Sequence, residues 1–411
     1  MKTRETVVIG AGQSGLAMSY ELASAGIEHV VLERGQVANS WRKERWDSLR
    51  LLTPNWMNGL AGLSYQGRDH DGFMTNAELI SQFTTAAKIN DTPIQCQTNV
   101  MSVRERWNGY MVQTDNGAIV CNNVVMANGG CGVPKIPSFA ASLHNDIVQY
   151  TPQNYKRPTD LPDGDVLIVG ASASGMQLAQ EIQKSGRQVT LAVGNHLRFP
   201  RDYRGVDILG WMDLIGVFSQ PYDKVDDLER VRRTPSLTLV GSDMRETIDL
   251  NSLQKIGVEI VGRLSAIRDD DFLFSGALSN LCKAADLKLE RLLRSIDDWL
   301  EQSNLTTLFP MTSAIPSTGV PEQSRLKLRS SSVRTVIWAT GFLSDFSWLD
   351  LPVFDRKGRL VHDGGVVAPG LYALGLPYMR TRKSTHIHGA QEDAQAIAHH
   401  ICNRLQKTMA A

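Results

Sequence analysis

The chain has 411 residues, of which 42% are hydrophobic, and its 43 Lys and Arg balance its 43 Asp and Glu. Because a domain typically has ~100–200 residues, this length predicts two or three folding units with ample core. A formal net charge of zero creates no global field that would attract nucleic acid or anionic lipid, so we expect neither as a partner. No apolar run approaches the ~18 residues of a membrane span, and none near the N-terminus is typical of a signal peptide. These features favour a cytoplasmic globular protein.

The cysteines and histidines predict neither a redox dithiol nor a metal site. The five cysteines are scattered, and no two of them form a Cys-x-x-Cys pair. Free cysteines fit a reducing cytoplasm. His386 and His388 could supply two metal ligands, but no third ligand lies at a suitable nearby spacing, so contact with a bound cofactor or substrate is the better interpretation.

A glycine-rich turn near the N-terminus predicts a dinucleotide site. Residues 6–9 are a short β-branched run, residues 10–15 read Gly-Ala-Gly-Gln-Ser-Gly, and small and apolar residues follow as in a helix. The first Gly allows a tight bend, the second lets the backbone approach a pyrophosphate, and the third lets helix and strand pack closely. A second strand at 29–32 ends at Glu33, 18 positions after Gly15 (33 − 15), close to the ~20 of a ribose-binding acid. The turn therefore suits the adenosine end of FAD or NAD.

A second turn of the same kind follows about 160 residues later. Residues 170–175 read Gly-Ala-Ser-Ala-Ser-Gly, with Ser172 in place of the middle Gly, and a β-branched run precedes them. The position equivalent to the ribose-binding acid (175 + 18) is Val193, with no acid nearby. Three arginines follow it, namely Arg198, Arg201 and Arg204. Loss of the acid and a gain of guanidinium groups suit a 2′-phosphate, so we expect NADPH here, although an Arg cluster is commonly a solvated loop.

The remaining elements, in chain order, predict how the two units are connected. A hairpin is expected at 100–114 and a strand at 120–126, and a proline-rich connection then places a boundary near residue 155. Later expectations are a strand at 257–261, a helical stripe at 278–299, a loop at 309–332, strands at 333–338 and 370–375, and a last helix at 390–405. We expect that stripe to be a packed helix, with a substrate lid or dimer face as the alternative.

Together these elements predict an α/β fold with two Rossmann-like dinucleotide-binding domains. The FAD-binding domain is expected to be discontinuous, with its first part at 1–155 and its second at 326–411. The NADPH-binding domain is expected at 156–325, inserted between them. The oligomeric state stays open, with a homodimer as the commonest closed assembly.

At this point nearly the whole chain resembles the flavin-containing monooxygenases, a family of single-component enzymes that use FAD and NADPH. The resemblance rests on the two turns with Glu33, on the segment 39–50, and on Ala-Thr-Gly-Phe at 339–342. The tail at 375–385 resembles a bacterial subgroup of flavoproteins.

The family's linker fingerprint, Phe-x-Gly-x-x-x-His-x-x-x-Tyr/Trp, is poorly met. With Tyr155 in its last place, Thr151 stands in the histidine place, and neither Phe nor Gly is in register. That histidine is typical of the Baeyer–Villiger branch, so its absence favours heteroatom oxygenation over the conversion of ketones to esters.

The resemblance implies that NADPH reduces FAD, that O2 adds to the flavin C4a, and that the resulting hydroperoxide transfers one oxygen atom. The acceptor would be a nitrogen, a sulfur or an electron-rich aromatic ring of a small organic substrate. The protein would orient the nicotinamide and exclude water. The alternatives are an NADPH:FAD oxidoreductase that passes electrons to another acceptor or to O2, a Baeyer–Villiger oxygenase, and a nucleotide-binding regulator without turnover.

The turns and the resemblance together assign residues to the site. Three catalytic roles are expected near the flavin, at Asn55, Lys383 and Thr385. Asn55 would donate to the peroxide or NADP⁺, or is a plain turn residue. Lys383 and Thr385 would donate to the flavin N1/O2 edge, or Lys383 is a solvated loop residue. The positions expected to bind the cofactors are Gly10, Gly12, Gln13, Ser14, Gly15, Glu33, Arg34, Trp41, Arg42, Gly170, Ser172, Ser174, Gly175, Arg198, Arg201, Ala339, Thr340, Gly341 and Gly375.

Overall fold

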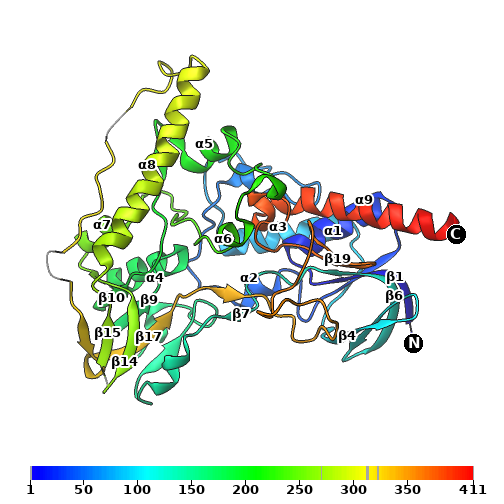
Figure 1. Cartoon of the computed structure of the whole chain (residues 1–411), viewed down its shortest axis with the longest axis horizontal. Coiled ribbons are helices and arrows are strands. Elements are labelled where there is room, and N and C mark those ends of the chain that lie inside the picture. The colour runs from blue at the N-terminus through cyan, green and yellow to red at the C-terminus, as the bar shows by residue number, and fades with distance from the viewer. Residues whose placement is uncertain (1, 270, 312–313, 322–323, 411) are drawn as a thin grey trace.

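The computed structural model describes residues 2–269, 271–311, 314–321 and 324–410. It contains two sheets of mainly parallel strands side by side, with the chain returning to the first sheet at its end (Figure 1). The strands of the first sheet are β1 (Lys2–Ile9), β2 (His29–Leu32), β3 (Ile94–Gln95), β4 (Val100–Arg106), β5 (Gly109–Thr114), β6 (Gly117–Met126), β19 (Val366–Ala368) and β20 (Leu371–Ala373). Their spatial order is β19, β20, β6, β1, β2, β3, and β4 and β5 extend from β6 as an antiparallel meander.

The first sheet is parallel where the first glycine-rich turn lies. β1 pairs in parallel with β2 on one side and β6 on the other, and β20 pairs in parallel with β6. Parallel neighbours need a crossover, which α1 (Gln13–Ser24) supplies between β1 and β2. The return of β20 to this sheet confirms that the first domain is built from both ends of the chain.

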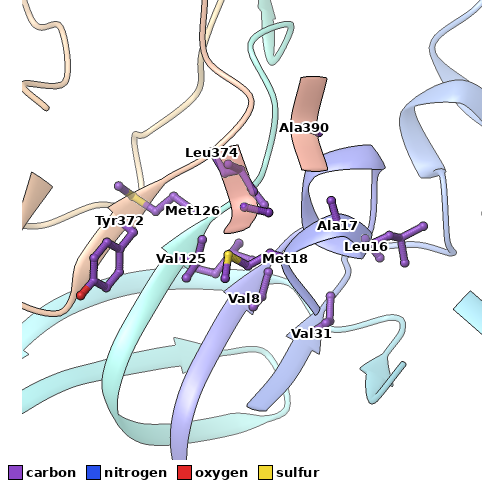
Figure 2. Close-up of a cluster of buried hydrophobic side chains, with 14 of the residues drawn as sticks. Val8, Leu16, Ala17, Met18, Val31, Val125, Met126, Tyr372, Leu374 and Ala390 are labelled. Atoms are coloured by element: carbon purple, nitrogen blue, oxygen red, sulfur yellow. The ribbon is translucent and has the colours of Figure 1, made fainter. Parts of the chain in front are cut away.

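Helices α1, α3 (Asn76–Ile89) and α9 (Gly389–Ala410) bury their apolar sides with this sheet in one core. Figure 2 shows side chains from both ends of the chain meeting in that core. They come from β1, α1, β2, β6, the segment at β20 and the start of α9, and include Val8, Leu16, Val31, Val125, Met126, Tyr372, Leu374 and Ala390. Because this core fixes α1 against β1, it holds the turn between them in place.

The second sheet has the order β13, β10, β9, β17, β8, with parallel pairing throughout. Its strands are β8 (Val148–Tyr150), β9 (Asp165–Val169), β10 (Val189–Ala192), β13 (Glu259–Val261) and β17 (Val333–Trp338). Helix α4 (Ala173–Lys184) crosses from β9 to β10, as α1 crosses from β1 to β2. Two Rossmann-like units therefore stand in one chain, as the sequence predicts.

Sheet membership corrects both predicted domain boundaries. β8 lies before the boundary expected near residue 155, and β17 lies after the one expected at 325/326, but both belong to the second sheet. The reason is hydrogen bonding in register, since Val336 aligns with Leu167 of β9 and Gln149 of β8. Between these strands the second domain also holds an antiparallel sheet of β14 (Leu264–Arg268), β15 (Asp271–Phe274) and β16 (Lys327–Arg329), the last inside the region expected to be a loop.

The long helix α8 (Leu278–Gln302) projects from the second domain beside α5 (Ile208–Leu214) (Figure 1). Its buried side chains, including Leu289 and Ile296, pack in one cluster with Trp211 of α5, which fits the expected packed helix. The other helices and strands are α2 (Asn39–Lys43), α6 (Leu228–Arg232), α7 (Leu250–Lys255), β7 (Val133–Pro134), β11 (Asp202–Tyr203), β12 (Val206–Asp207) and β18 (Phe342–Leu343). Over the described ranges, no helix has the length and apolar character needed to cross a membrane.

Candidate functional site

The first turn has the close backbone approaches that only glycine permits. Gly10 has φ +106°, and a Cβ there would lie 2.7 Å from the carbonyl oxygen of Ala127, just after β6. A Cβ on Gly15 would lie 1.8 Å from the carbonyl oxygen of Gly10, so helix α1 packs directly on the turn. Around Gly12, in contrast, no atom lies within 4 Å of a built Cβ. The open space at the N-terminus of α1 is where a pyrophosphate can reach free backbone N–H groups.

Glu33 stands at the end of β2 with its carboxylate oriented by the backbone. One oxygen accepts a hydrogen bond from the N–H of Ala11 and the other from that of Gly35, both at 2.9 Å. The side chain is buried, with 6% exposed. A carboxylate has about four lone-pair sites, so two acceptor positions remain for ribose hydroxyl groups. These acceptor positions fit the adenosine end of FAD.

The second turn repeats this geometry. Gly170 has φ +111°, and a Cβ there would lie 2.3 Å from the carbonyl oxygen of Ala339. A Cβ on Gly175 would lie 1.8 Å from the carbonyl oxygen of Gly170. Ser172 is the N-cap of α4 but makes no side-chain cap hydrogen bond, so its hydroxyl can donate to a phosphate oxygen.

Residues 339–341, which the sequence assigns to cofactor binding, lie beside the second turn. Ala339 lies beneath the second turn as Ala127 lies beneath the first. The hydroxyl of Thr340 donates to the carbonyl of Lys135, and Gly341 follows with φ +94° and open space at its Cβ position.

Gly375 packs in the same way against the start of α1. A Cβ on Gly375 would lie 2.3 Å from Oγ of Ser14, a side chain that is itself only 4% exposed. Gly375 therefore allows the C-terminal segment to approach the first turn.

Both turns open on a single pocket of about 470 Å³. Gln13 of the first turn and Ser174 of the second line it together with Trp41, Thr53 and Thr385. Nε2 of Gln13 donates to the carbonyl of Thr385 at 3.0 Å, which ties the first turn to the segment before α9. The walls are mainly apolar and include Trp46, Leu49, Leu52, Leu197, Met212 and Phe218. The pocket therefore lies where two bound dinucleotides would meet.

Among the predicted site residues that do not line this pocket, four polar ones have partners elsewhere. Asn55 is buried and its Nδ2 donates to the carbonyl of Asp69, which leaves only its Oδ1 without a partner. Nζ of Lys383 is bound to Glu392 at 2.5 Å. The other two are Arg34, paired with Glu44 at 2.6 Å, and Arg42, which donates to Val37 and Thr84.

The arginines expected to hold a 2′-phosphate, Arg198 and Arg201, form ion pairs with carboxylates in this structure. Arg198 is 5% exposed and its guanidinium is bound to Asp249 at 2.9 Å and Asp286 at 2.8 Å. Arg201 is fully buried, forms a bidentate pair with Asp207, and donates to the carbonyl of Leu52. Guanidinium groups that already satisfy buried carboxylates are not available to a phosphate, because leaving those carboxylates unpaired costs several kcal/mol.

Arg263 is an exposed arginine beside the residues that follow β10. It follows β13, which pairs with β10, so it lies beside the residues after β10 where a ribose 2′ position falls in this fold. Its side chain is exposed, and Nη2 donates to Oδ1 of Asn195 at 3.0 Å. No ion pair is found for it among the described residues. Sequence spacing could not have identified Arg263, because it lies on a different strand from the turn.

Polar groups that sequence patterns did not identify also line the pocket. They are Arg45, Arg50, Arg232 and Arg382, together with Tyr378.

His386, which the sequence placed near flavin or substrate, lines the pocket too and packs edge-on against Phe218 at 5.0 Å between ring centroids. Burial lowers the pKa of His386 to about 3, so the ring is neutral near pH 7, and its Nδ1 has no partner. In the part of the chain that the structure describes, no three His, Cys, Asp or Glu side chains are placed to bind a metal.

Two dinucleotide turns that open on one pocket define a flavoprotein oxidoreductase, and its cofactors are FAD and NADPH. Residues 7–207 match the family described as pyridine nucleotide-disulphide oxidoreductase. The oxidoreductase CzcO-like of Geobacillus kaustophilus is 30% identical over 403 residues, 97% of this chain and 98% of the relative. The chain thus belongs to the CzcO-like oxidoreductases.

The chain is also similar to more distant proteins. Probable indole-3-pyruvate monooxygenase YUCCA4 of Arabidopsis thaliana is 24% identical over 73% of this chain and 78% of its own. Among solved structures, a flavin-containing monooxygenase from Stenotrophomonas maltophilia has a TM-score of 0.67 at 17% identity, covering 98% of this chain and 99% of that chain. OTEMO in complex with FAD and NADP has a TM-score of 0.57 at 14% identity, covering 98% and 86%. At these identities the solved structures show the fold.

Proposed function

We propose that the chain is an NADPH-dependent FAD monooxygenase that inserts one oxygen atom of O2 into a small organic substrate. The atom oxidised would be a nitrogen, a sulfur or a carbon of an electron-rich aromatic ring. The observation that carries this proposal is the shared, mainly apolar pocket onto which both turns open. The monooxygenase names of the relatives YUCCA4 and YUCCA6 support it.

The chain's own residues would hold the two cofactors at this pocket. Glu33 would accept hydrogen bonds from the FAD ribose, and the N–H groups at the start of α1 would bind the pyrophosphate around Gly12. Bound FAD would supply the redox and oxygen chemistry of the reaction. The start of α4, with Ser172 and Ser174, would bind the pyrophosphate of NADPH.

Arg263 would bind the 2′-phosphate of NADPH. It presents an exposed guanidinium beside Asn195, and an Arg fork suits a phosphate because it donates two parallel hydrogen bonds. This replaces the role that the sequence suggested for Arg198.

The apolar pocket walls would exclude water, and His386 would hold a proton at one of its ring nitrogens. Trp46, Leu49 and Phe218 cover the pocket with apolar surface, which limits access of water to the reacting atoms. A neutral imidazole has one nitrogen that donates and one that accepts. His386 can therefore hold a proton at one ring nitrogen while its unpartnered Nδ1 faces a ligand. Thr385 would contribute a hydroxyl from the same segment.

The test is to incubate the purified yellow protein with NADPH and ¹⁸O2 and to analyse the products from a panel of amines, sulfides and aromatic compounds. Incorporation of one labelled atom per product supports the proposal. Consumption of NADPH with stoichiometric H2O2 and no labelled product would instead identify an oxidase. A dithiol reductase is disfavoured because all five cysteines are free and Cys131 alone among them lines the pocket.

A further inference from the structure

The charged groups that line the pocket are all basic. Arg45, Arg50, Arg232 and Arg382 contribute to its walls, and no Asp or Glu of the described chain does. A mainly apolar pocket with an excess of guanidinium groups is a costly arrangement for the free protein, because each buried charge loses hydration. Such an arrangement points to an anionic group that is present when the site is occupied.

Two of these arginines come from different domains and both contact one residue, Tyr378. Arg232 is the last residue of α6, and its Nε and Nη2 both approach the carbonyl of Tyr378 at 3.4 Å. Arg382 begins the short helical turn Arg382–Thr385, and its guanidinium lies 5.3 Å from the centre of the Tyr378 ring. Tyr378 is itself 4% exposed, so it is a rigid support for both.

Neither guanidinium has a carboxylate partner among the described residues. Nε of Arg382 is buried without any hydrogen-bond partner. Burial is the largest influence on Arg232 and lowers its pKa, and the nearest acid that acts on it is Glu229. Glu229 is already bound to Arg233 at 2.8 Å and to Arg359. Nη1 of Arg232, which does not bind the Tyr378 carbonyl, and Nε of Arg382 are therefore the donors that can take an anion.

Other acids close to the pocket are also engaged. Glu392 is held by Lys383, and Asp243 is paired with Arg50 at 3.1 Å. Arg50 is thereby neutralised, and Arg45 lies over the ring of Trp41, with 5.0 Å between Cζ and the ring centre. Arg232 and Arg382 are the two unpaired guanidinium groups that share a support.

The cofactor phosphates have other partners in this fold. Each pyrophosphate has the N-terminus of its own helix, α1 or α4, and the 2′-phosphate has Arg263. These sites do not require the pair at Tyr378.

We propose that the substrate is a carboxylate-bearing aromatic molecule whose anionic group is held between Arg232 and Arg382. This inference rests on the proposed function, because it concerns the molecule that is oxidised in the same pocket. A carboxylate between the two guanidinium groups would accept charge-assisted hydrogen bonds from both of them. Phe218 and Met212 supply apolar wall that suits a ring.

The test measures binding rather than turnover, so it is independent of the oxygenation assay. Isothermal titration of the FAD-loaded protein compares two acids with their neutral amides, phenylacetate with phenylacetamide and indole-3-acetate with indole-3-acetamide. Because charge-assisted hydrogen bonds contribute more than neutral ones, we expect at least one acid to bind about ten- to a hundredfold more tightly than its amide. Equal affinity, or no binding of either acid at millimolar concentration, would overturn the inference.

Variants then locate the anion site. Arg232→Gln and Arg382→Gln should each reduce the preference for the acid about tenfold or more while leaving amide affinity unchanged. Arg233→Gln is the matched control, since Arg233 is the adjacent exposed residue and does not line the pocket. A preference that survives in both variants refutes the assignment, as does a loss confined to FAD content or NADPH affinity.

The two proposals can fail separately. Labelled oxygen in neutral products, with no preference for acids, would retain the monooxygenase and remove the anion site. An acid preference that disappears in the two variants, with no oxygen transfer to any product, would retain the anion site and remove the monooxygenase.

Discussion

Two alanine substitutions in the first turn should have opposite consequences, although the glycines are only three positions apart. At Gly15 a Cβ would lie 1.8 Å from the carbonyl oxygen of Gly10, whereas ordinary contact begins near 3.4 Å. Helix and turn must therefore separate by 1.6 Å (3.4 − 1.8). At Gly12 the backbone has φ −89°, which alanine adopts easily, and no atom lies within 4 Å of the added Cβ.

Gly15→Ala should therefore destabilise the folded protein, and Gly12→Ala should weaken FAD binding. Overpacking against backbone costs about 3 kcal/mol or more, while an added methyl in open space changes stability by about 0.5 kcal/mol or less. In Gly12→Ala the methyl takes space beside the pyrophosphate, and loss of one or two charge-assisted hydrogen bonds lowers affinity about ten- to a hundredfold.

The assay separates the two effects by measuring each variant without FAD and then with FAD. Thermal unfolding of the FAD-free proteins should show wild-type stability for Gly12→Ala and a clear loss for Gly15→Ala. Titration with FAD, followed by flavin fluorescence, should show the affinity loss in Gly12→Ala. The reasoning is refuted if Gly12→Ala retains wild-type FAD affinity, or if FAD-free Gly15→Ala unfolds at the wild-type temperature.

Four further predictions concern charge. In steady-state assays, Arg263→Ala should raise KM for NADPH about tenfold and leave KM for NADH unchanged, since only NADPH carries the 2′-phosphate. Equal changes in the two KM values would contradict this role of Arg263. Arg198→Ala should lower the free energy of unfolding by about 3 kcal/mol in urea titrations, because the largely buried carboxylates of Asp249 and Asp286 lose their cationic partner. The ratio of the two KM values should stay at its wild-type value. Glu33→Gln should lower the flavin content after purification, measured by the visible absorbance relative to that at 280 nm, and full retention would show that the carboxylate is dispensable. Burial raises the pKa of Asp393 to about 6, above the ~3.9 of the unfolded chain, so its contribution to stability is greatest below pH 4 and is lost as pH rises to 6. Asp393→Asn should therefore gain about 3 kcal/mol relative to wild type at pH 8 but not at pH 4, and a gain that is equal at both values would disprove this account.

Much of the fold was predictable because its signals are local. The spacing of Gly10, Gly12 and Gly15 between a strand and a helix predicts a turn whose geometry depends on contacts within a few residues. The same holds for the second turn and for Glu33, whose carboxylate accepts from backbone groups at both ends of its own βαβ unit. The domain boundaries were less predictable, because β8 and β17 join the second sheet through pairing across nearly 190 residues.

The sequence by itself determined that two dinucleotides bind, since strand, glycine turn and helix follow one another in the chain in both units. Only the tertiary structure decided which charged groups are available. Arg198 meets its carboxylates 51 and 88 positions further on, so nearby sequence could not reveal that its charge is already neutralised. The pair Arg232 and Arg382 belongs to different domains and meets only because both approach Tyr378. Whether a charged side chain can bind a ligand depends on the groups that surround it in space, and only the folded chain determines those groups.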